Sequence, residues 1–157
     1  TVTLAIHLAQ LPLDDELLVA NSDQILDWNV QEFLNMSSSY DAGVVVFHCP
    51  GLDPKWSYAR VRHGLVTKIA EKNPISEYAT AGIYYWRRTE DFLRSTTTMF
   101  ALDDRHNGEF YVAPSYNYLI AERKKVFAYE VHPGAMHGLG TPEDLAAYVE
   151  RREAARQ

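Results

Sequence analysis

The sequence contains a short apolar run, Gly43-Val44-Val45-Val46-Phe47, that continues into His48-Cys49. A run of this length, rich in β-branched residues, is typical of a strand that is buried on both faces of a sheet. On either side of it, similar patterns predict strands over residues 16–20, 65–70, 80–86 and 125–131. Helices are predicted over residues 1–10, 30–36, 90–100, 114–121 and 142–152. Strands that alternate with helices indicate an α/β fold, in which a mixed sheet is flanked by helices.

Three local details refine this prediction. The strand Glu16–Ala20 has the apolar character of a buried parallel strand. No helix is predicted between residues 43 and 86, so part of the sheet is expected to be mixed or antiparallel. Asp27 or Asn29 is positioned to cap the helix at 30–36, and Thr141 the helix that begins at Pro142.

Composition excludes several classes of protein. The 157 residues carry a formal charge of −6, which argues against a nucleic-acid partner because such proteins usually show a basic stripe. No apolar run approaches the ~20 residues of a membrane-spanning helix. The single cysteine, Cys49, excludes an internal disulfide, and without a signal peptide we expect a cytoplasmic protein. Thr1 opens directly into a helical pattern, so we expect residues 1–157 to form one domain that is incomplete at its N-terminus.

A polar segment, Asn21-Ser22-Asp23-Gln24, follows the strand at 16–20. In open α/β sheets, ligands bind beyond the carboxyl ends of the strands. A carboxylate at this place could hold Mg²⁺, which takes one or two carboxylates together with phosphate oxygens and water. The alternative is that Asp23 is a turn residue that caps the next helix.

Three further segments carry residues that could contribute to a binding site. Glu71-Lys72-Asn73-Pro74 offers a carboxylate for hydroxyl groups and an ammonium for a phosphate, although the segment taken alone favours an exposed ion pair at a strand end. Trp56-Ser57-Tyr58-Ala59-Arg60 offers an aromatic face for a sugar ring or a base. The alternative is that these aromatic residues form a cluster in the core. Gly82 lies within a predicted strand, which suggests a close backbone approach there, with packing of the sheet as the alternative. The histidines form no recognisable metal set, and no G-x-S-x-G segment supports hydrolysis.

The order of these segments resembles that of bacterial sugar-phosphate nucleotidyltransferases, in the branch that serves capsule and surface-polysaccharide synthesis. The resemblance covers essentially the whole chain, which is similar to the C-terminal portion of the family. It rests on Leu18–Asp23, Trp56–Ala59, Ala70–Pro74, Ala79–Tyr84, Gly108–Tyr111 and Gly138–Leu145.

The resemblance implies a Rossmann-like, glycosyltransferase-A-type fold and an enzyme that joins a nucleoside triphosphate to a sugar 1-phosphate or similar phosphorylated acceptor, releasing pyrophosphate. It implies two catalytic residues. Asp23 would bind Mg²⁺, and Lys72 would contact the acceptor phosphate. The implied acceptor-binding residues are Tyr58, Ala59, Glu71, Lys72, Gly82, Glu109, Tyr111 and Asn117.

The sequence departs from the family pattern in two ways. The Gly-rich loop with Arg and Pro-Lys that cradles the triphosphate is absent from these residues, and the usual second metal aspartate is replaced by Gly138. The resemblance therefore implies an isolated chain that is inactive, with the N-terminal strands missing and a sheet edge that could pair in a homo-oligomer. The alternatives are a non-catalytic binding or regulatory module and, third, a glycosyltransferase that consumes nucleotide-sugars.

Overall fold

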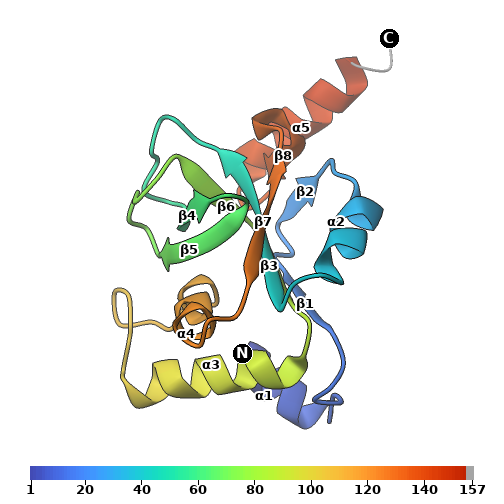
Figure 1. The fold of residues 1–157 in the computed structure, drawn as a ribbon. Coiled ribbons are helices and arrows are strands. Elements are labelled where there is room, and N and C mark those ends of the chain that lie inside the picture. Colours follow the sequence, from blue (N-terminus) through green and yellow to red (C-terminus); the bar gives the residue numbers. More distant parts are fainter. Residues whose placement is uncertain (155–157) are drawn as a thin grey trace.

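A computed structural model describes residues 1–154 of the chain (Figure 1). Its helices are α1 (Val2–Leu8), α2 (Val30–Ser37), α3 (Thr89–Ala101), α4 (Tyr116–Ala121) and α5 (Pro142–Ala154), with short 3₁₀ turns η1 (Ala113–Ser115) and η2 (Pro133–Ala135). Its strands are β1 (Leu17–Ala20), β2 (Gln24–Leu26), β3 (Ala42–His48), β4 (Tyr58–Arg62), β5 (Leu65–Ala70), β6 (Tyr78–Trp86), β7 (Val126–Val131) and β8 (Met136–Gly138).

Six strands form one mixed sheet in the order β1-β6-β3-β7-β5-β4. Strands β3 and β7 run parallel, and the other pairs are antiparallel. Strand β4, at the end of this order, also pairs with β6 through Tyr58 and Ala79, so the hairpin of β4 and β5 connects β7 with β6. Strands β2 and β8 form a separate two-stranded ribbon. The mixed α/β architecture expected from the sequence is therefore confirmed.

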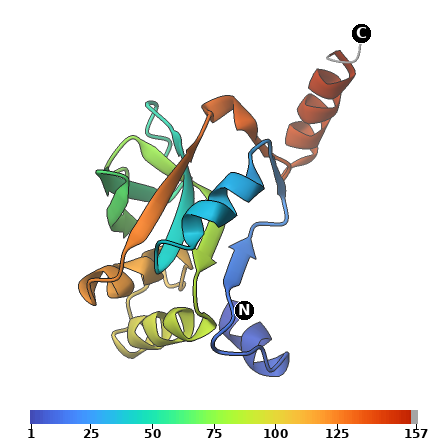
Figure 2. The same cartoon turned by 45° about the vertical axis from the view of Figure 1, so that its right-hand side comes forward.

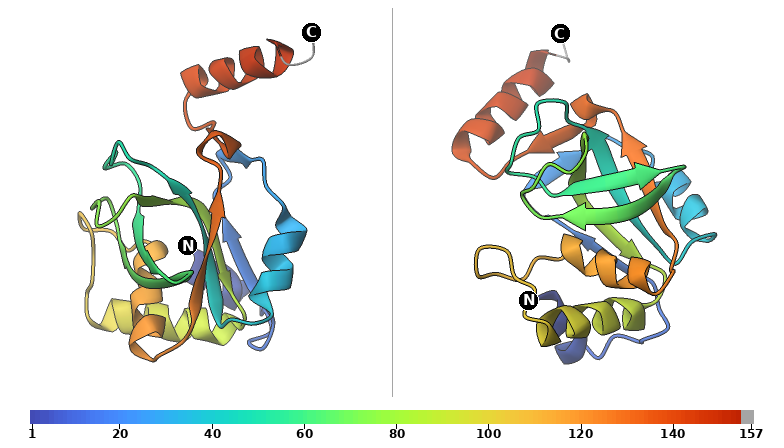
Figure 3. Two further views of the ribbon diagram at one scale, coloured as in Figure 1. Left: turned by 45° about the horizontal axis from the view of Figure 1, so that its top comes forward. Right: turned by 60° about the vertical axis from the view of Figure 1, so that its left-hand side comes forward.

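The sheet divides the core into two layers, as Figure 3 shows. On one face Val44, Trp86 and Phe92 pack in a cluster that includes residues of α1, α3 and α4. On the other face Phe33 of α2 packs with Val45 and other residues. Neighbouring residues of β3 thus enter opposite layers, as the alternation of side chains along a strand requires. The apolar run at residues 43–47 is explained by the burial of β3 on both faces of the sheet.

The hydroxyl of Tyr116 ties α4 to the centre of the sheet. Its single proton is shared between the carbonyl oxygens of Gly43 and Tyr85, which lie 2.8 and 3.1 Å from the hydroxyl oxygen. The Tyr116 ring stacks on that of Trp86, with centroids 4.6 Å apart. A buried phenol needs such partners, because an unpaired hydroxyl in the core costs about 1–3 kcal/mol. The first turn of α4 is fixed against β3 and β6 by these contacts.

Most elements expected from the sequence are present, but the expectation for the first strand was wrong. Strand β1 lies at the edge of the sheet, antiparallel to β6, and is not a buried parallel strand. Only Leu17 is buried in it, whereas Leu18 is 48% exposed. The apolar run suggested burial on both faces, but an edge strand with one covered face can have the same composition. The expected cap of α2 is confirmed, because Asn29 accepts from the Glu32 amide at 3.1 Å.

Three strands, β2, β4 and β8, were not anticipated as strands. Strands β2 and β8 have three residues each, too few to show a period of two. Their pairing matters for the site, because it sets Gln24 opposite Gly138. It also lets the Leu139 amide donate to the Asp23 carbonyl at 2.7 Å. The segment near the end of the chain is thereby brought to Asp23.

Helix α5 projects from the body of the molecule (Figure 2) and has no buried residue. Its N-terminus is capped as the sequence predicts, since the Asp144 amide donates to the Thr141 hydroxyl oxygen at 3.1 Å. Between residues 1 and 154 no helix combines the length and the apolar character needed to cross a membrane.

Replacing Gly43 by alanine should destabilise the fold. A β-carbon at this position would overlap the ring of Phe127, and overpacking of a core typically costs about 1–3 kcal/mol. Urea unfolding should show a lower midpoint for Gly43→Ala and no change for Gly51→Ala, because a β-carbon at Gly51 meets no atom within 4 Å. Adding Phe127→Leu should recover part of the loss. Equal midpoints for Gly43→Ala and the parent chain would contradict this packing.

Candidate functional site

A cavity of about 330 Å³, here called the Glu71 cavity, lies against β1, β6 and the segment that precedes α4. Its polar lining is provided by Asn21, Lys55, Ser57, Glu71, Lys72, Thr80, Tyr84 and Tyr111. Trp56 adds an aromatic wall. A pocket that combines aromatic walls with a few placed polar groups is suited to a small ligand that carries hydroxyl groups.

Glu71 is held inside this cavity by the turn that follows β5. Lys72 adopts a left-handed backbone conformation, with φ of 48°, and the chain reverses there. As a result Glu71 is only 8% exposed, whereas Lys72 is exposed. The Ser57 hydroxyl donates to one Glu71 carboxylate oxygen. A carboxylate can accept about four hydrogen bonds, so Glu71 keeps capacity for ligand hydroxyl groups.

Tyr84 and Thr80 supply hydroxyl groups to the same cavity. Their oxygens lie 3.1 Å apart in a hydrogen bond. Burial raises the pKa of Tyr84 to about 12, because the phenolate form would lose its hydration. The phenol is therefore neutral at physiological pH and can act as a hydrogen-bond donor.

Lys72 is oriented by a short chain of hydrogen bonds. Its ammonium donates to the Tyr111 hydroxyl at 3.1 Å, and that hydroxyl donates to Glu109 at 2.8 Å. The ammonium also lies 5.0 Å from the centre of the Tyr111 ring. The Tyr111 hydroxyl is the main cause of the raised pKa of Lys72, because it stabilises the charged form. These contacts hold a cation beside the Glu71 carboxylate, and the negative charges of Glu71 and Glu109 contribute to the raised pKa of Lys72.

Asp23 lies in an adjoining cavity of about 290 Å³, here called the Asp23 cavity. Gly138, Gly140 and Asp144 form part of its wall. A β-carbon at Gly140 would lie 3.2 Å from an Asp23 carboxylate oxygen, so the absence of a side chain leaves room for this carboxylate. Asn21, Lys55 and Trp56 line both cavities. The structure thus places Asp23 and the Glu71–Lys72 pair in neighbouring cavities with a common wall.

Gly82 fixes the loop that carries Asp23. It adopts φ of 68°, and a β-carbon there would overlap the Asn21 side chain. The backbone N–H of Asn21 donates to the Gly82 carbonyl at 3.0 Å, and the side-chain amide of Gln24 donates to the Ala81 carbonyl. The close approach suggested by a glycine in the strand is therefore made to a neighbouring loop. Gly82 also lines the Glu71 cavity.

Four residues implied by the resemblance lie outside both cavities: Tyr58, Ala59, Glu109 and Asn117. The Tyr58 side chain is buried on the other face of the sheet, where its hydroxyl donates to the Asp53 carbonyl at 2.9 Å. Ala59 is fully buried in the core. The Asn117 amide group accepts from and donates to the backbone of Ile69, at 2.9 and 2.8 Å. Tyr58 and Asn117 thus use their polar groups in structural hydrogen bonds.

The donors near Asp23 fit a magnesium ion only in part. Asp23 and Asp144 both line the cavity, but one Asp144 oxygen already accepts from Thr141 at 2.9 Å. Among residues 1–154 no cluster of three or more Asp, Glu, His or Cys side chains is arranged to hold a metal. Mg²⁺ usually keeps several waters and binds one or two carboxylates plus substrate phosphates. The residues therefore fit a magnesium ion that arrives with a phosphate ligand.

The sequence pattern did not single out several residues of the site. Ser57 holds Glu71, Tyr84 lines the Glu71 cavity, and Asp144 reaches the Asp23 cavity. Lys55 was also not singled out, although it precedes Trp56 in a loop with proline, a composition common in binding loops. Asp144 was recognised only as a capping residue, because its approach to Asp23 depends on the pairing of β2 with β8.

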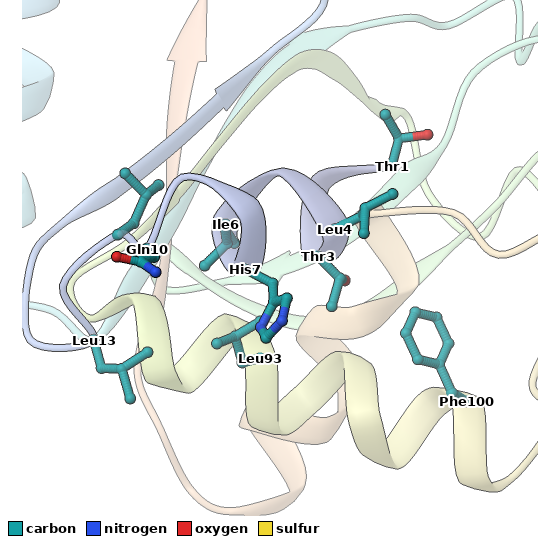
Figure 4. Close-up of a pocket in the computed structure, with 10 residues that line it drawn as sticks. Thr1, Thr3, Leu4, Ile6, His7, Gln10, Leu13, Leu93 and Phe100 are labelled. Atoms are coloured by element: carbon teal, nitrogen blue, oxygen red, sulfur yellow. The ribbon is translucent and has the colours of Figure 1, made fainter.

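A larger groove of about 710 Å³ lies between α1 and α3, away from these residues (Figure 4). Its lining includes Leu4, Leu13, Leu93 and Phe100, and His7 is its one titratable side chain. Such a groove can bury apolar surface, but it lacks carboxylates and lysines for a phosphorylated ligand. The carboxylates and lysines suited to such a ligand lie instead in the two polar cavities.

No protein-family model and no curated protein sequence matches the chain. Solved structures do match it. A nucleoside-diphosphate-sugar pyrophosphorylase from Vibrio cholerae is similar, with a TM-score of 0.78 and 25% identity over 92% of this chain and 60% of that one. A proposed glucose-1-phosphate thymidylyltransferase from Bacillus anthracis, in complex with a sucrose, gives a TM-score of 0.69 and 20% identity over 93% of this chain and 56% of that one.

The inositol-1-phosphate CTP transferase from T. maritima gives a TM-score of 0.55 and 14% identity, over 86% of this chain and 53% of that one. At these lower identities the second and third likenesses show the fold alone. The chain spans between 53% and 60% of the length of the three solved chains. Its structural neighbours are nucleotidyltransferases of the nucleotide-sugar pyrophosphorylase and glucose-1-phosphate thymidylyltransferase kinds, and it shares their mixed α/β fold.

Replacing Tyr111 by phenylalanine should lower the pKa of Lys72 toward its usual value of 10.5, because the hydroxyl that accepts from the ammonium is lost. The Lys72 side-chain resonances, followed by NMR through a pH titration, report this pKa. Since the pKa is raised in the folded state, the stabilising effect of this contact is full below pH 10.5 and is lost as the pH rises through the folded pKa. Tyr118→Phe, which removes a hydroxyl bound to Asp104, should leave Lys72 unchanged.

Proposed function

We propose that this chain is the acceptor-side portion of a nucleotidyltransferase. The enzyme transfers a nucleoside monophosphate from a nucleoside triphosphate to a sugar 1-phosphate or similar phosphorylated acceptor, and it releases pyrophosphate. The observation that carries the proposal is the common wall between the cavity of Glu71 and Lys72 and the cavity of Asp23. The name of the Vibrio neighbour, a nucleoside-diphosphate-sugar pyrophosphorylase, supports this class of reaction.

The acceptor occupies the Glu71 cavity. Glu71 accepts hydrogen bonds from its hydroxyl groups, while Lys72 binds its phosphate through a charge-assisted hydrogen bond. The ring wall of Trp56 and the neutral Tyr84 phenol complete a site that a sugar can fill. Gly82 lines this cavity beside the acceptor, and its missing side chain leaves room for the Asn21 side chain. This arrangement suits an acceptor with one anionic end and one end rich in hydroxyl groups.

The chemistry requires positioning rather than a strong base. An oxygen of the acceptor phosphate forms a bond to the α-phosphorus of the triphosphate. The bond from that phosphorus to the bridging oxygen breaks, and its electron pair leaves with pyrophosphate. The acceptor phosphate is already an anionic nucleophile, so no side chain has to remove a proton. Asp23 would hold Mg²⁺, which when bound neutralises and orients phosphate oxygens.

We further propose that the sheet is of the Rossmann-like, glycosyltransferase-A type and that the first strands and the triphosphate loop lie outside this chain. The support is the coverage, because the chain matches between 53% and 60% of each solved neighbour. The reaction would supply a nucleotide-sugar for surface polysaccharide. The isolated chain would then bind the acceptor but need further residues for turnover.

A non-catalytic binding module is a second candidate, favoured by Gly138. The family places a second aspartate there, whereas in this chain a β-carbon at Gly138 would meet only open space. The two candidates are separated by turnover in a longer protein that contains this chain. Pyrophosphate release in a screen of nucleoside triphosphates against sugar 1-phosphates supports the enzyme. Acceptor binding without release in that protein supports the module.

Replacing Asp23 by asparagine should abolish pyrophosphate release in the longer protein, because the neutral amide holds Mg²⁺ much more weakly than the carboxylate. Thermal unfolding should be nearly unchanged, since Asp23 is exposed and its backbone contacts remain. Asp15→Asn, at an exposed aspartate that lines neither cavity, is the matched control and should keep full turnover. Retained turnover in Asp23→Asn would refute the metal role.

Replacing Glu71 by glutamine should raise the KM for the acceptor about 10- to 100-fold, the range expected when hydrogen bonds to a charged group are lost. The kcat should change less, because Glu71 binds the part of the acceptor that does not react. Ser57→Ala should cause a smaller rise, since it frees the Glu71 carboxylate without removing it. An unchanged KM in Glu71→Gln would place the acceptor elsewhere.

A further inference from the structure

Lys55 occupies a special position, because it lines both the Glu71 cavity and the Asp23 cavity. Asn21 and Trp56 also line both, but neither carries a charge. Among the residues described, no other lysine or arginine reaches the Asp23 cavity, and only Lys72 joins Lys55 in the Glu71 cavity. Lys55 is therefore the one cationic residue among the described residues that line both cavities.

Local contacts orient the Lys55 side chain but leave it accessible. Its ammonium lies 3.2 Å from an Asp53 carboxylate oxygen and 4.9 Å from the centre of the Trp56 ring. The Lys55 amide also donates to Asp53 at 3.0 Å, which closes the turn. The Lys55 side chain is nevertheless 63% exposed. An exposed ion pair of this kind contributes little free energy, so the ammonium can take an additional anionic partner at low cost.

The charge of the two cavities shows why a cation is needed at this wall. The Asp23 cavity contains two carboxylates, those of Asp23 and Asp144, and its lining would repel a phosphate unless a cation offset them. In the proposed reaction two phosphate groups must also approach each other from neighbouring cavities. Lys72 lines only the first of these. A lysine shared by both cavities can lower the repulsion between the two anions at the point where they meet.

We propose that Lys55 is a phosphate-binding residue that contacts the phosphate groups on both sides of this wall, the acceptor phosphate and the phosphate chain beside Asp23. The inference rests on the proposed function, because it takes the occupants of the two cavities from that reaction. The site would then have two phosphate-binding lysines, Lys55 and Lys72, with different roles. Lys72 holds the acceptor alone, whereas Lys55 holds both reacting groups.

The test uses two probes on the 157-residue chain, glucose 1-phosphate for the Glu71 cavity and inorganic pyrophosphate with Mg²⁺ for the Asp23 cavity. Isothermal titration calorimetry measures the Kd of each. Lys55→Gln should weaken both probes, each about tenfold, because one charge-assisted hydrogen bond is lost. Lys55→Arg, which keeps the charge, should restore most of the affinity. Lys72→Gln should weaken glucose 1-phosphate more than pyrophosphate.

A second variant separates the charge of Lys55 from the shape of its loop. Asp53→Asn removes the ion pair but keeps an oxygen that can accept from the Lys55 amide. It should therefore retain or increase the affinity for both probes. If Asp53→Asn weakens binding as much as Lys55→Gln does, the effect comes from the loop and the inference is overturned. It is also overturned if Lys55→Gln weakens one probe or neither, or if the parent chain binds neither probe.

These results are distinguishable from failure of the proposed function. That function is tested by pyrophosphate release from nucleoside triphosphates in the longer protein. If both probes lose affinity in Lys55→Gln and no triphosphate is turned over, Lys55 is a phosphate-binding residue of a non-catalytic module. If turnover occurs and Lys55→Gln leaves both Kd values unchanged, the enzyme stands and Lys55 has no part in phosphate binding.

Discussion

The contact between Gly82 and Asn21 is the constraint on which the site depends. Strand β6 runs through the sheet between β1 and β3, and at Gly82 its backbone adopts a conformation that side chains rarely allow. The missing side chain of Gly82 lets the side-chain amide of Asn21 lie against the strand. The backbone N–H of Asn21 donates to the Gly82 carbonyl, and this hydrogen bond fixes the start of the loop. That loop carries Asp23. A β-carbon at position 82 would overlap the side chains of Asn21 and Gln24, and the positive φ would strain any residue other than glycine.

The remaining parts of the site are held by the ends of the elements around β6. The turn after β5 buries Glu71 and exposes Lys72, and the segment before α4 supplies Tyr111 to orient that lysine. Tyr116, bonded to the backbone of β3 and β6, holds this segment in place from inside the core. The polar groups of the site therefore sit on segments whose backbones are fixed by buried contacts. Such an arrangement gives a binding site its geometry before the ligand arrives.

Charge gives the two cavities different characters although they adjoin. The Glu71 cavity combines one carboxylate with two lysines, whereas the Asp23 cavity has two carboxylates and one lysine. The first suits a compound with hydroxyl groups and one phosphate, and the second suits phosphate oxygens that bring a divalent cation with them. In the proposed reaction these are the acceptor and the phosphate chain of the nucleotide. The single shared cation lies between them.

The sequence by itself determined the α/β class, most of the helices and strands, and the segments that contain Asp23, Glu71 and Lys72, because apolar periodicity and turn residues are local properties. It did not reveal the edge position of β1 or the short strands β2 and β8, since these depend on which segments pair. It also could not show that Tyr58 and Asn117 use their polar groups in the framework. Only the tertiary structure brought Lys55 and Asp144 to the site. Their positions follow from contacts between segments far apart along the chain, which no local pattern of residues encodes.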